Sequence, residues 1–333
     1  QLTKDEYTKK YLVTELNDIV YNPANVKYGA IDRNKCRRGL ISPIYVTFTT
    51  NEIPGFIERI VTSHDFQQRA LRFEEGTVTK RQSVNPEDLV TLDILVASKR
   101  EEQQKIATYF DSLDNLITLH QRKCDETKKL KKYMLQKMFP QSGQTVPEIR
   151  FSGFTDVWEQ RKWMNSVDIS TEMVDPASGE YDDMPHIAPG NIESFTGRIL
   201  DNVRTVKEEQ LISGKFRFRP DDVVYGKINP QLGKYFYASV DGLTSADAYV
   251  FKGKNGIRQK FLFSMLQTSD FFKYSVSVSK RSGMPKINRD ELNAYAFLAP
   301  SEEEQDKIGN FLLEIDHLIT LHQRKQKYTK YTI

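Results

Sequence analysis

The sequence predicts an α+β protein: two mixed α/β domains joined by two long helices that form an antiparallel coiled coil, in a pseudo-two-fold repeat. The first observation is that the segment Leu116-Ile-Thr-Leu-His-Gln-Arg-Lys123 returns unchanged as Leu318-Ile-Thr-Leu-His-Gln-Arg-Lys325. The second is that Glu102-Gln-Gln-Lys-Ile106 matches Glu304-Gln-Asp-Lys-Ile308 at the same spacing. A repeat of such long period indicates that one structural unit occurs twice in the chain.

The two domains are predicted to be diverged copies of one another. The motif Asn17-Asp-Ile-Val-Tyr21 corresponds to Asp221-Asp-Val-Val-Tyr225, and Gly39-Leu-Ile-Ser42 corresponds to Gly242-Leu-Thr-Ser245. A much longer segment precedes the motif in the second domain, so the first domain is shortened at its N-terminus or lacks its opening segment. The predicted order is first domain, first helix, second domain and second helix, over residues 1–98, 99–139, 140–300 and 301–333.

Short strands and one helix are expected in each domain. The runs Ile41–Phe48 and Lys234–Val240 alternate β-branched or aromatic residues with polar ones, which is typical of strands. Apolar residues at helical spacing predict a helix over residues 257–274, with a counterpart over residues 54–71.

The two long helices, which we call the stems, carry apolar positions spaced alternately by four and three residues. This spacing is typical of a coiled-coil seam, the stripe that faces a partner helix. The first stem would form a rod of roughly 55 Å at about 1.5 Å per residue. The alternative is that each stem caps only its own domain. The expected seam residues are Ile106, Phe110, Leu113, Ile117 and His120 in the first stem, and Ile308, Leu312, Ile315, Ile319 and His322 in the second.

Composition indicates a well-solvated protein of two ordinary domains. The chain has 333 residues, of which 38% are hydrophobic and 28% charged. No apolar stretch approaches the ~18–20 residues that cross a bilayer, and the polar N-terminus predicts no signal peptide. Cys36 and Cys124 lie far apart and predict no disulfide, so we expect a cytoplasmic protein.

Catalytic motifs are not found in the sequence. No phosphate-binding loop of the G-x-x-x-x-G-K-[ST] type occurs, and the histidines show no metal-ligand spacing with the cysteines. Asn22-Pro-Ala-Asn25 only approaches the motif of an adenine methyltransferase. Asp221 and Asp222 with Lys227 faintly suggest a nuclease cluster, but Asn17 replaces the first acid in the other copy, which favours a turn before a strand. No enzyme activity is therefore expected.

Two diverged domains, two nearly identical stems and the Glu-Gln-x-x-Ile openings resemble the specificity (S) subunit of type I restriction-modification enzymes. The segment Phe151-Ser-Gly-Phe-Thr-Asp-Val-Trp-Glu-Gln-Arg-Lys162 is similar to the start of a target-recognition domain in that family. The resemblance covers almost the whole chain. It departs from the family at the opening of the first domain and at the last turns of the second stem.

The resemblance implies that each domain is a target-recognition domain reading one half of a bipartite site in double-stranded DNA. It also implies that the coiled coil sets the spacing and docks two modification (methyltransferase) subunits, while restriction (translocase/nuclease) subunits can join. S-adenosylmethionine is expected on the modification subunits, whereas this chain would bind no cofactor, metal or membrane. The alternatives are a coiled-coil scaffold that assembles partners without DNA, and a self-sufficient nucleic-acid enzyme.

Candidate DNA contacts lie in the turn after each Val-Tyr strand and in a second, basic loop. Arg and Lys side chains suit guanine and phosphate, and Asn and Gln suit adenine. A solvated charged face is the alternative interpretation of each cluster. The candidates are Asn22, Asn25, Lys27, Tyr28, Arg33, Lys35, Arg37, Arg38, Lys80 and Arg81 in the first domain, and Lys227, Asn229, Gln231, Lys234, Tyr235, Lys280, Arg281 and Lys286 in the second.

Overall fold

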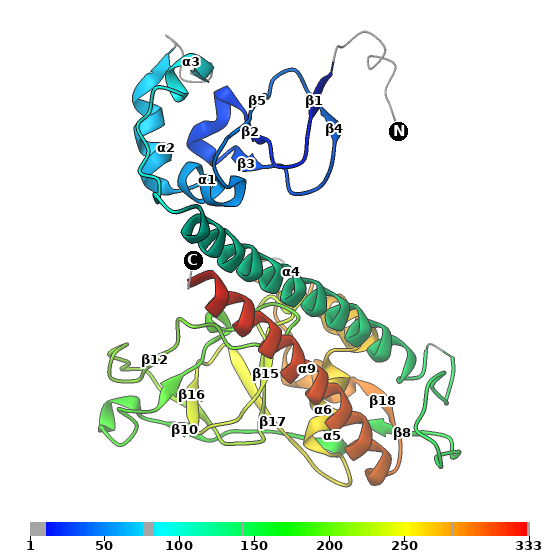
Figure 1. Cartoon of the computed structure of the whole chain (residues 1–333). Coiled ribbons are helices and arrows are strands. Elements are labelled where there is room, and N and C mark those ends of the chain that lie inside the picture. The colour runs from blue at the N-terminus through cyan, green and yellow to red at the C-terminus, as the bar shows by residue number, and fades with distance from the viewer. Residues whose placement is uncertain (1–10, 76–82, 142, 281–282, 332–333) are drawn as a thin grey trace. The chain divides into compact units, whose positions relative to one another are not determined.

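A computed structural model describes residues 11–75, 83–141, 143–280 and 283–331. The chain forms two compact units, one of residues 1–119 with 328–333 and the other of residues 120–327. We call them the N-terminal unit and the C-terminal unit, and each is described by itself (Figure 1).

The N-terminal unit is a small mixed α/β structure. Its strands are β1 (Leu12–Thr14), β2 (Ile19–Tyr21), β3 (Ile31–Arg33), β4 (Gly39–Ile41), β5 (Val46–Phe48), β6 (Glu74–Glu75) and β7 (Ser83–Val84). Its helices are η2 (Pro23–Tyr28), α1 (Pro54–Val61), α2 (His64–Ala70), η3 (Leu71–Phe73), α3 (Pro86–Leu89) and the first part of α4 (Arg100–Lys137).

The C-terminal unit is larger, with a four-stranded and a five-stranded sheet. Its strands are β8 (Glu159–Lys162), β9 (Val167–Ile169), β10 (Met173–Val174), β11 (Pro185–His186), β12 (Arg204–Thr205), β13 (Lys215–Phe218), β14 (Val223–Gly226), β15 (Tyr235–Tyr237), β16 (Gly242–Thr244), β17 (Ala248–Gly253) and β18 (Ala296–Ala299). Its helices are the second part of α4, α5 (Trp163–Ser166), η4 (Pro176–Ser178), η5 (Pro189–Asn191), η6 (Pro230–Leu232), α6 (Gln259–Leu266), α7 (Ser269–Val278), α8 (Arg289–Ala294) and most of α9 (Glu302–Tyr331).

The same antiparallel pairing occurs in both units. In the N-terminal unit β2 lies between β3 and β5, with Tyr21 opposite Ile31. In the C-terminal unit β14 lies between β15 and β17, with Tyr225 opposite Tyr235. The pair β1–β4 likewise matches the pair β13–β16 residue for residue. The internal repeat is therefore a repeat of strand register, which places the same turn at the same end of each sheet.

The helices predicted over residues 54–71 and 257–274 are each broken into two. In both units a second helix starts at the equivalent position, where a side-chain hydroxyl caps it. The Ser63 hydroxyl accepts the backbone N–H of Phe66, and the Thr268 hydroxyl accepts that of Phe271. Such N-caps satisfy the free N–H groups at the start of a second helix. The prediction of single continuous helices was wrong, and the pairs α1–α2 and α6–α7 replace them.

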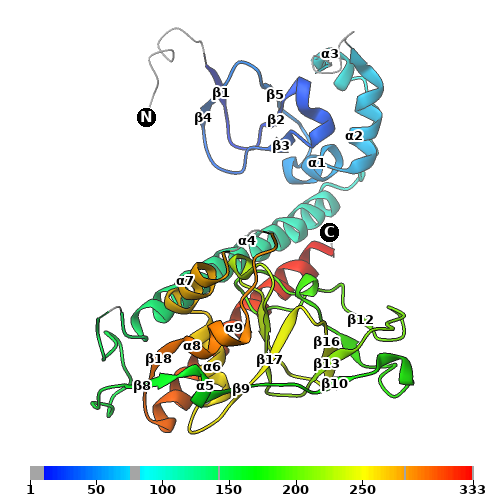
Figure 2. The ribbon, with the colours of Figure 1, turned by 180° about the vertical axis from the view of Figure 1, so that it is seen from behind.

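The stems pair antiparallel within the C-terminal unit. His120 of α4 lies 3.3 Å from His322 of α9, between their Nδ1 atoms, and Lys131, further along α4, contacts Asp316, an earlier residue of α9. The two helices run side by side in both views (Figures 1 and 2). The predicted fold class, mixed α/β domains with long coiled-coil helices, is confirmed.

The first turns of each stem contribute to the core of a domain. Ile106 packs against the core of the N-terminal unit, and Ile308 and Leu312 are buried in the core of the C-terminal unit. A glutamine also joins the start of each stem to its domain by a hydrogen bond. The side-chain carbonyl of Gln103 accepts the backbone N–H of Ile53 at the start of α1, and Gln305 makes the equivalent bond at α6.

Candidate nucleic-acid interface

Two loops that were candidates on separate grounds lie side by side in the C-terminal unit. The loop after β14 meets the loop before α8, since Ile228 and Lys286 form a β-bridge. The backbone N–H of Asn229 donates to Pro285 at 2.8 Å, and that of Ile287 donates to Lys227 at 3.0 Å. The internal repeat in the sequence does not predict this contact. We call the surface formed by the two loops the loop pair.

Among the described residues, no carboxylate lies within ion-pair distance of the loop-pair cations Lys227, Lys286 and Arg289. Lys227 Nζ lies 5.0 Å from the centre of the Tyr249 ring, and the Arg289 guanidinium lies 5.8 Å from the same ring. Arg289 donates to the neutral backbone carbonyls of Ile169 and Ser170. Burial lowers the pKa of Lys227, and repulsion from Lys286 and Arg289 lowers it further, although Asp247 opposes this shift.

Amide side chains lie beside these cations. Asn229 has left-handed backbone geometry, with φ 50°, at the start of η6, and Gln231 is exposed and donates to the Asn229 side chain. Asparagine tolerates this conformation better than most residues. The loop pair thus combines charges suited to phosphate or guanine with amides suited to adenine.

Arg289 and Tyr249 were missed in the sequence, since neither stands in a basic run. Arg289 follows the capping residue Asn288 inside an acidic helix start, and Tyr249 occupies a strand. The only available signal was that Arg289 lies three positions after the candidate Lys286.

Two candidate DNA-contact residues of the C-terminal unit, Tyr235 and Lys234, have side chains that make contacts inside the unit. The Tyr235 side chain is buried in the core, where desolvation raises its pKa. Lys234 donates its ammonium to the carbonyl of Ile192. These positions argue against direct base contacts, because the side chains are turned inward. Lys280 and Lys286 are exposed, and Arg281 lies outside the described residues.

Arg33 is also held inside its unit rather than offered to DNA. Its side chain is only 12% exposed and pairs with buried Glu58 and with Asp111 of α4, both at 2.7 Å. Lys35 joins the same network, at 2.6 Å from Glu58 and 2.9 Å from Asp114. Both cations bind the domain to its stem, which argues against Arg33 as a DNA contact, whereas Lys35 is 37% exposed and stays a prediction.

Asp114 shows how strongly that network is coupled. Burial alone would raise the pKa of Asp114, but hydrogen bonds from Arg59 and Lys35 outweigh burial and the pKa is lowered. The carboxylate is therefore ionised throughout the neutral range, as a structural ion pair requires.

The remaining DNA-contact candidates of the N-terminal unit also divide into buried and accessible side chains. Asn22 is buried and caps η2 by accepting the backbone N–H of Ala24, so it is corrected to a structural residue. Asn25 is partly buried within η2. Accessible side chains remain at Tyr28, with Lys27 over its ring, and at Arg37 and Arg38. Lys80 and Arg81 lie outside the described residues.

The turn before each central strand is structural. Asn17 and Asp221 both have left-handed backbone geometry, with φ 75° and 70°. The carboxylates that follow, Asp18 and Asp222, each accept a backbone N–H three residues earlier. The arrangement is the turn expected as the alternative to a nuclease cluster.

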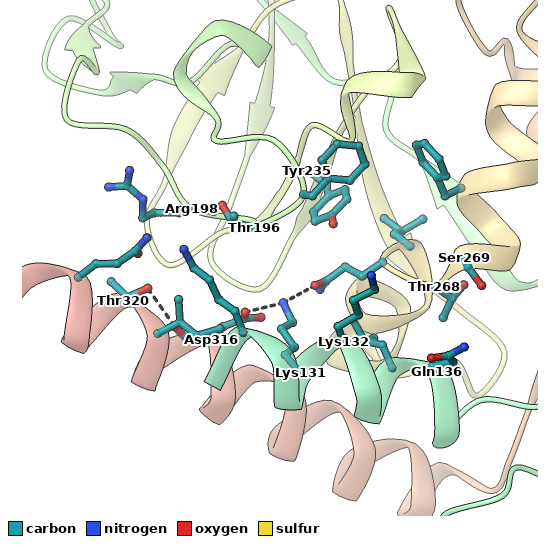
Figure 3. A pocket seen from close by; sticks show the side chains of 18 residues that line it. Lys131, Lys132, Gln136, Thr196, Arg198, Tyr235, Thr268, Ser269, Asp316 and Thr320 are labelled. Atoms are coloured by element: carbon teal, nitrogen blue, oxygen red, sulfur yellow. Dashed lines mark hydrogen bonds and ion pairs between the residues drawn. The ribbon is translucent and has the colours of Figure 1, made fainter. Parts of the chain in front are cut away.

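A cavity of about 560 Å³ lies between the stems and the sheet of the C-terminal unit (Figure 3). Its floor holds Lys131, whose ammonium binds Asp316 of the other stem and Gln267 of the domain. Burial lowers the pKa of Lys131 and raises that of Asp316. This buried pair joins both stems to the domain and disfavours other registers, since an unpaired buried charge is costly.

Within the described ranges, no three His, Cys, Asp or Glu side chains are arranged to hold a metal ion. Across the same residues, no helix has the length and apolar character of a membrane span.

The chain is similar in sequence and in fold to known proteins. A family model described as the type I restriction modification DNA specificity domain matches residues 175–329, which include the loop pair and most of the second stem. Residues 175–329 of this chain therefore resemble the DNA specificity domain of type I restriction-modification systems. The chain is 30% identical over 173 residues to the type I restriction enzyme EcoDI specificity subunit of Escherichia coli, a match covering 51% of this chain and 38% of that one.

A second relative is the type I restriction enzyme HindI specificity subunit of Haemophilus influenzae, 27% identical over 146 residues, covering 38% of this chain and 30% of that one. The chain thus spans less than two-fifths of the length of these curated relatives.

Solved structures agree in fold. The crystal structure of a type I restriction-modification system S subunit from M. genitalium has a TM-score of 0.68 at 13% identity, covering 97% of this chain and 82% of that one. A chain from a structure described as concerning complex assembly and conformational transition of the type I R-M system has a TM-score of 0.51 at 17% identity, covering 98% and 80%. At these identities the likeness establishes the fold alone.

Proposed function

We propose that this chain is the DNA-reading, non-catalytic subunit of a type I restriction-modification complex in the cytoplasm. Each unit reads one half of a bipartite site in double-stranded DNA, and the stems set the separation of the halves. The observation that carries the proposal is the loop pair, where Lys227, Lys286 and Arg289 gather beside Asn229 and Gln231 within the matched specificity domain.

The loop pair is proposed to bind phosphates and base edges together. A protein that neutralises a phosphate releases a condensed counterion, so each such contact adds about 0.9 to the slope of log affinity against log salt. Lysine contacts to phosphate give affinity and register, whereas Asn229 and Gln231 can give sequence choice through hydrogen bonds in the major groove.

The double substitution Lys227→Ala/Lys286→Ala should weaken binding of the complex to its DNA at least tenfold and reduce the salt slope by about 2. The measurement is fluorescence anisotropy with labelled duplex at several salt concentrations. A matched control is Lys207→Ala/Lys254→Ala, because those lysines pair with Asp182 and Asp168. Equal salt slopes in the two variants would remove the loop pair from the interface.

The stems are proposed to recruit two modification subunits, which would carry S-adenosylmethionine, and restriction subunits can join them. The identical octapeptides expose the same two leucines in both copies, Leu116 and Leu119 on α4 and Leu318 and Leu321 on α9, each 44–49% exposed. A pair of exposed leucines repeated without change suits two copies of one partner better than it suits a core.

If the leucines dock modification subunits, Leu119→Glu should lower the stoichiometry from two modification subunits to one, and Leu119→Glu with Leu321→Glu should abolish docking. Light scattering on the purified complex measures this. Retention of two subunits by the double variant would place docking elsewhere. A scaffold without DNA binding, the second candidate function, predicts normal assembly with no selection of any sequence from a random duplex library.

A further inference from the structure

The cavity between the stems and the sheet of the C-terminal unit has the size and the lining of a small-molecule site. Its volume of about 560 Å³ falls within the range of ~300–1,000 Å³ that is typical of ligand pockets. Such pockets are mostly apolar, with a few polar groups that orient the ligand. The apolar side chains that line this cavity each come from a different element, and they are Leu135, Phe195, Tyr235, Leu266, Phe272 and Ile319.

Phe195 forms an aromatic wall of the cavity and is held there against its backbone preference. It lies in the hairpin of residues 192–199 with φ 64°, in the left-handed region that bulky residues avoid. Its backbone N–H donates to the carbonyl of Gly233 at 2.8 Å, and a Cβ added at Gly233 would lie 2.5 Å from the Phe195 ring. The ring also packs edge-on against Phe272, with 5.5 Å between the centroids.

The exposure of Phe195 indicates that this strain does not serve the core. The residue stays 52% exposed although its surroundings fix it on two sides. Backbone strain persists only where neighbouring structure enforces it, and it clusters at ligand-binding sites. The ring is therefore positioned as a surface on which a planar group can stack.

Cations gather at the cavity with too few carboxylates to neutralise them. Lys128 and Lys132 lie one turn apart on the same face of α4, and both are exposed and form no ion pair with a described carboxylate. Arg198 of the hairpin lies on the other side of the cavity and pairs with Glu193 at 3.0 Å (Figure 3). The buried pair on the cavity floor adds no net charge. Three cations beside one carboxylate leave an excess of two positive charges, which suits a dianion.

A buried acceptor without a donor also faces this region. Gln323 of α9 is one of the lining residues, and its side-chain carbonyl accepts no hydrogen bond within the described part of the chain. An unmade hydrogen bond at a buried acceptor is costly, so a ligand that brings an N–H group is favoured. A fatty acid would match the apolar lining and the cations, but it has no such donor and no ring to stack on Phe195.

We propose that this cavity binds a free nucleoside monophosphate. The phosphate, which is nearly a dianion at neutral pH, pairs with Lys128 and Lys132. The base stacks on Phe195 and donates an N–H to Gln323. These contacts come from both stems and from the hairpin of the domain, so the nucleotide ties the three together. No residue of the loop pair lines the cavity, and the site goes beyond the proposed function.

The test uses the full chain and 2-aminopurine riboside 5′-monophosphate, whose fluorescence is quenched when its base stacks on an aromatic ring. Quenching should saturate at one nucleotide per chain, and AMP should displace the probe. Adenosine, which lacks the phosphate, should displace it at least tenfold less well than AMP. No saturable quenching, or equal affinities of AMP and adenosine, would overturn the proposal. Displacement of the probe by duplex DNA would assign the cavity to the DNA interface and overturn its assignment to a free nucleotide.

Two variants make the assignment specific to the phosphate. Lys128→Ala/Lys132→Ala should remove the advantage of AMP over adenosine and leave the affinity for adenosine unchanged. The matched control is Arg122→Ala/Lys129→Ala, because both residues are exposed on the same helix and neither lines the cavity. An equal loss of AMP affinity in the two variants would contradict the site.

A third variant tests the aromatic wall. Phe195→Asn should keep the chain folded, because asparagine tolerates the left-handed backbone, and should abolish the quenching of the bound probe. Circular dichroism verifies the fold of the variant. Full quenching by a folded Phe195→Asn chain would show that the base does not stack there and would overturn the proposal.

Discussion

At the scale of single residues, equal charges have unequal roles that the sequence does not reveal. Arg33 and Lys35 stand in the same basic run as Arg37 and Arg38, and all four were candidates for DNA contacts. The first two bind buried Glu58, which is distant in sequence. A local charge count cannot foresee this, because the acids that capture a cation come from other elements.

The histidine pair was easier to foresee. His120 and His322 occupy identical positions in the octapeptides, so an antiparallel pairing of the stems brings them together. Burial lowers the pKa of His322, and the charges of His120, Lys123 and Lys325 lower it further. The neutral imidazole is therefore the form that suits the folded stems.

This pair should make the stems sensitive to acid. Because the folded-state pKa of His322 lies below its unfolded value of about 6.5, stability is full above that pH and is lost as pH falls through it. Thermal unfolding followed between pH 7.5 and 5 should show a smaller loss of melting temperature in His322→Asn than in the unaltered chain. His317→Asn, at an exposed site on the same helix, is the control, and identical profiles for all three proteins would contradict the assignment.

At the scale of elements, each stem packs closely against one helix of its domain at a glycine. The glycine belongs to the domain helix in the N-terminal unit and to the stem in the C-terminal unit. In the N-terminal unit Gly55 of α1 faces Ala107 of α4, whereas in the C-terminal unit Lys260 of α6 faces Gly309 of α9. These are equivalent positions in the repeat, so the loss of a small residue on one helix is offset by its gain on the other. Divergence of the two copies has conserved the close approach rather than the residue.

The substitution Gly309→Ala should destabilise the C-terminal unit by about 1–2 kcal/mol. A Cβ there would lie 2.6 Å from the Lys260 Cβ and 2.8 Å from backbone atoms of α6, an overpacking that outweighs the gain of about 1 kcal/mol in helix propensity. Urea unfolding measures the change, with exposed Glu303→Ala as the control. Unchanged or increased stability of Gly309→Ala would contradict this prediction, because it would show that α6 can move away from the added Cβ without cost.

The elements themselves were predictable to different degrees. The octapeptide and its apolar spacing predicted the stems and their antiparallel pairing, because the helical period is a property of local sequence. The break between α6 and α7 was missed, since its apolar spacing continues across the cap at Thr268. The loop pair was predicted only as two separate loops, because the bridge from Ile228 to Lys286 joins segments far apart in the chain.

At the scale of the whole molecule, α4 is an unbroken helix of 38 residues that begins in the N-terminal unit and ends in the C-terminal unit. In the proposed function this helix transmits a fixed spacing from one reading domain to the other. A scaffold would need the stems but would tolerate changes in that spacing, so the length of α4 distinguishes the two functions.

The most direct measurement is therefore the gap between half-sites after insertion of one heptad in α4 following Leu119. Seven residues add about 10 Å of helix while keeping the apolar phase of the stem that pairs with α9. Selection from a random duplex library by the assembled complex should recover the same two half-sites with a gap about three base pairs longer. Recovery of the original gap would contradict the role of the stems as the spacer.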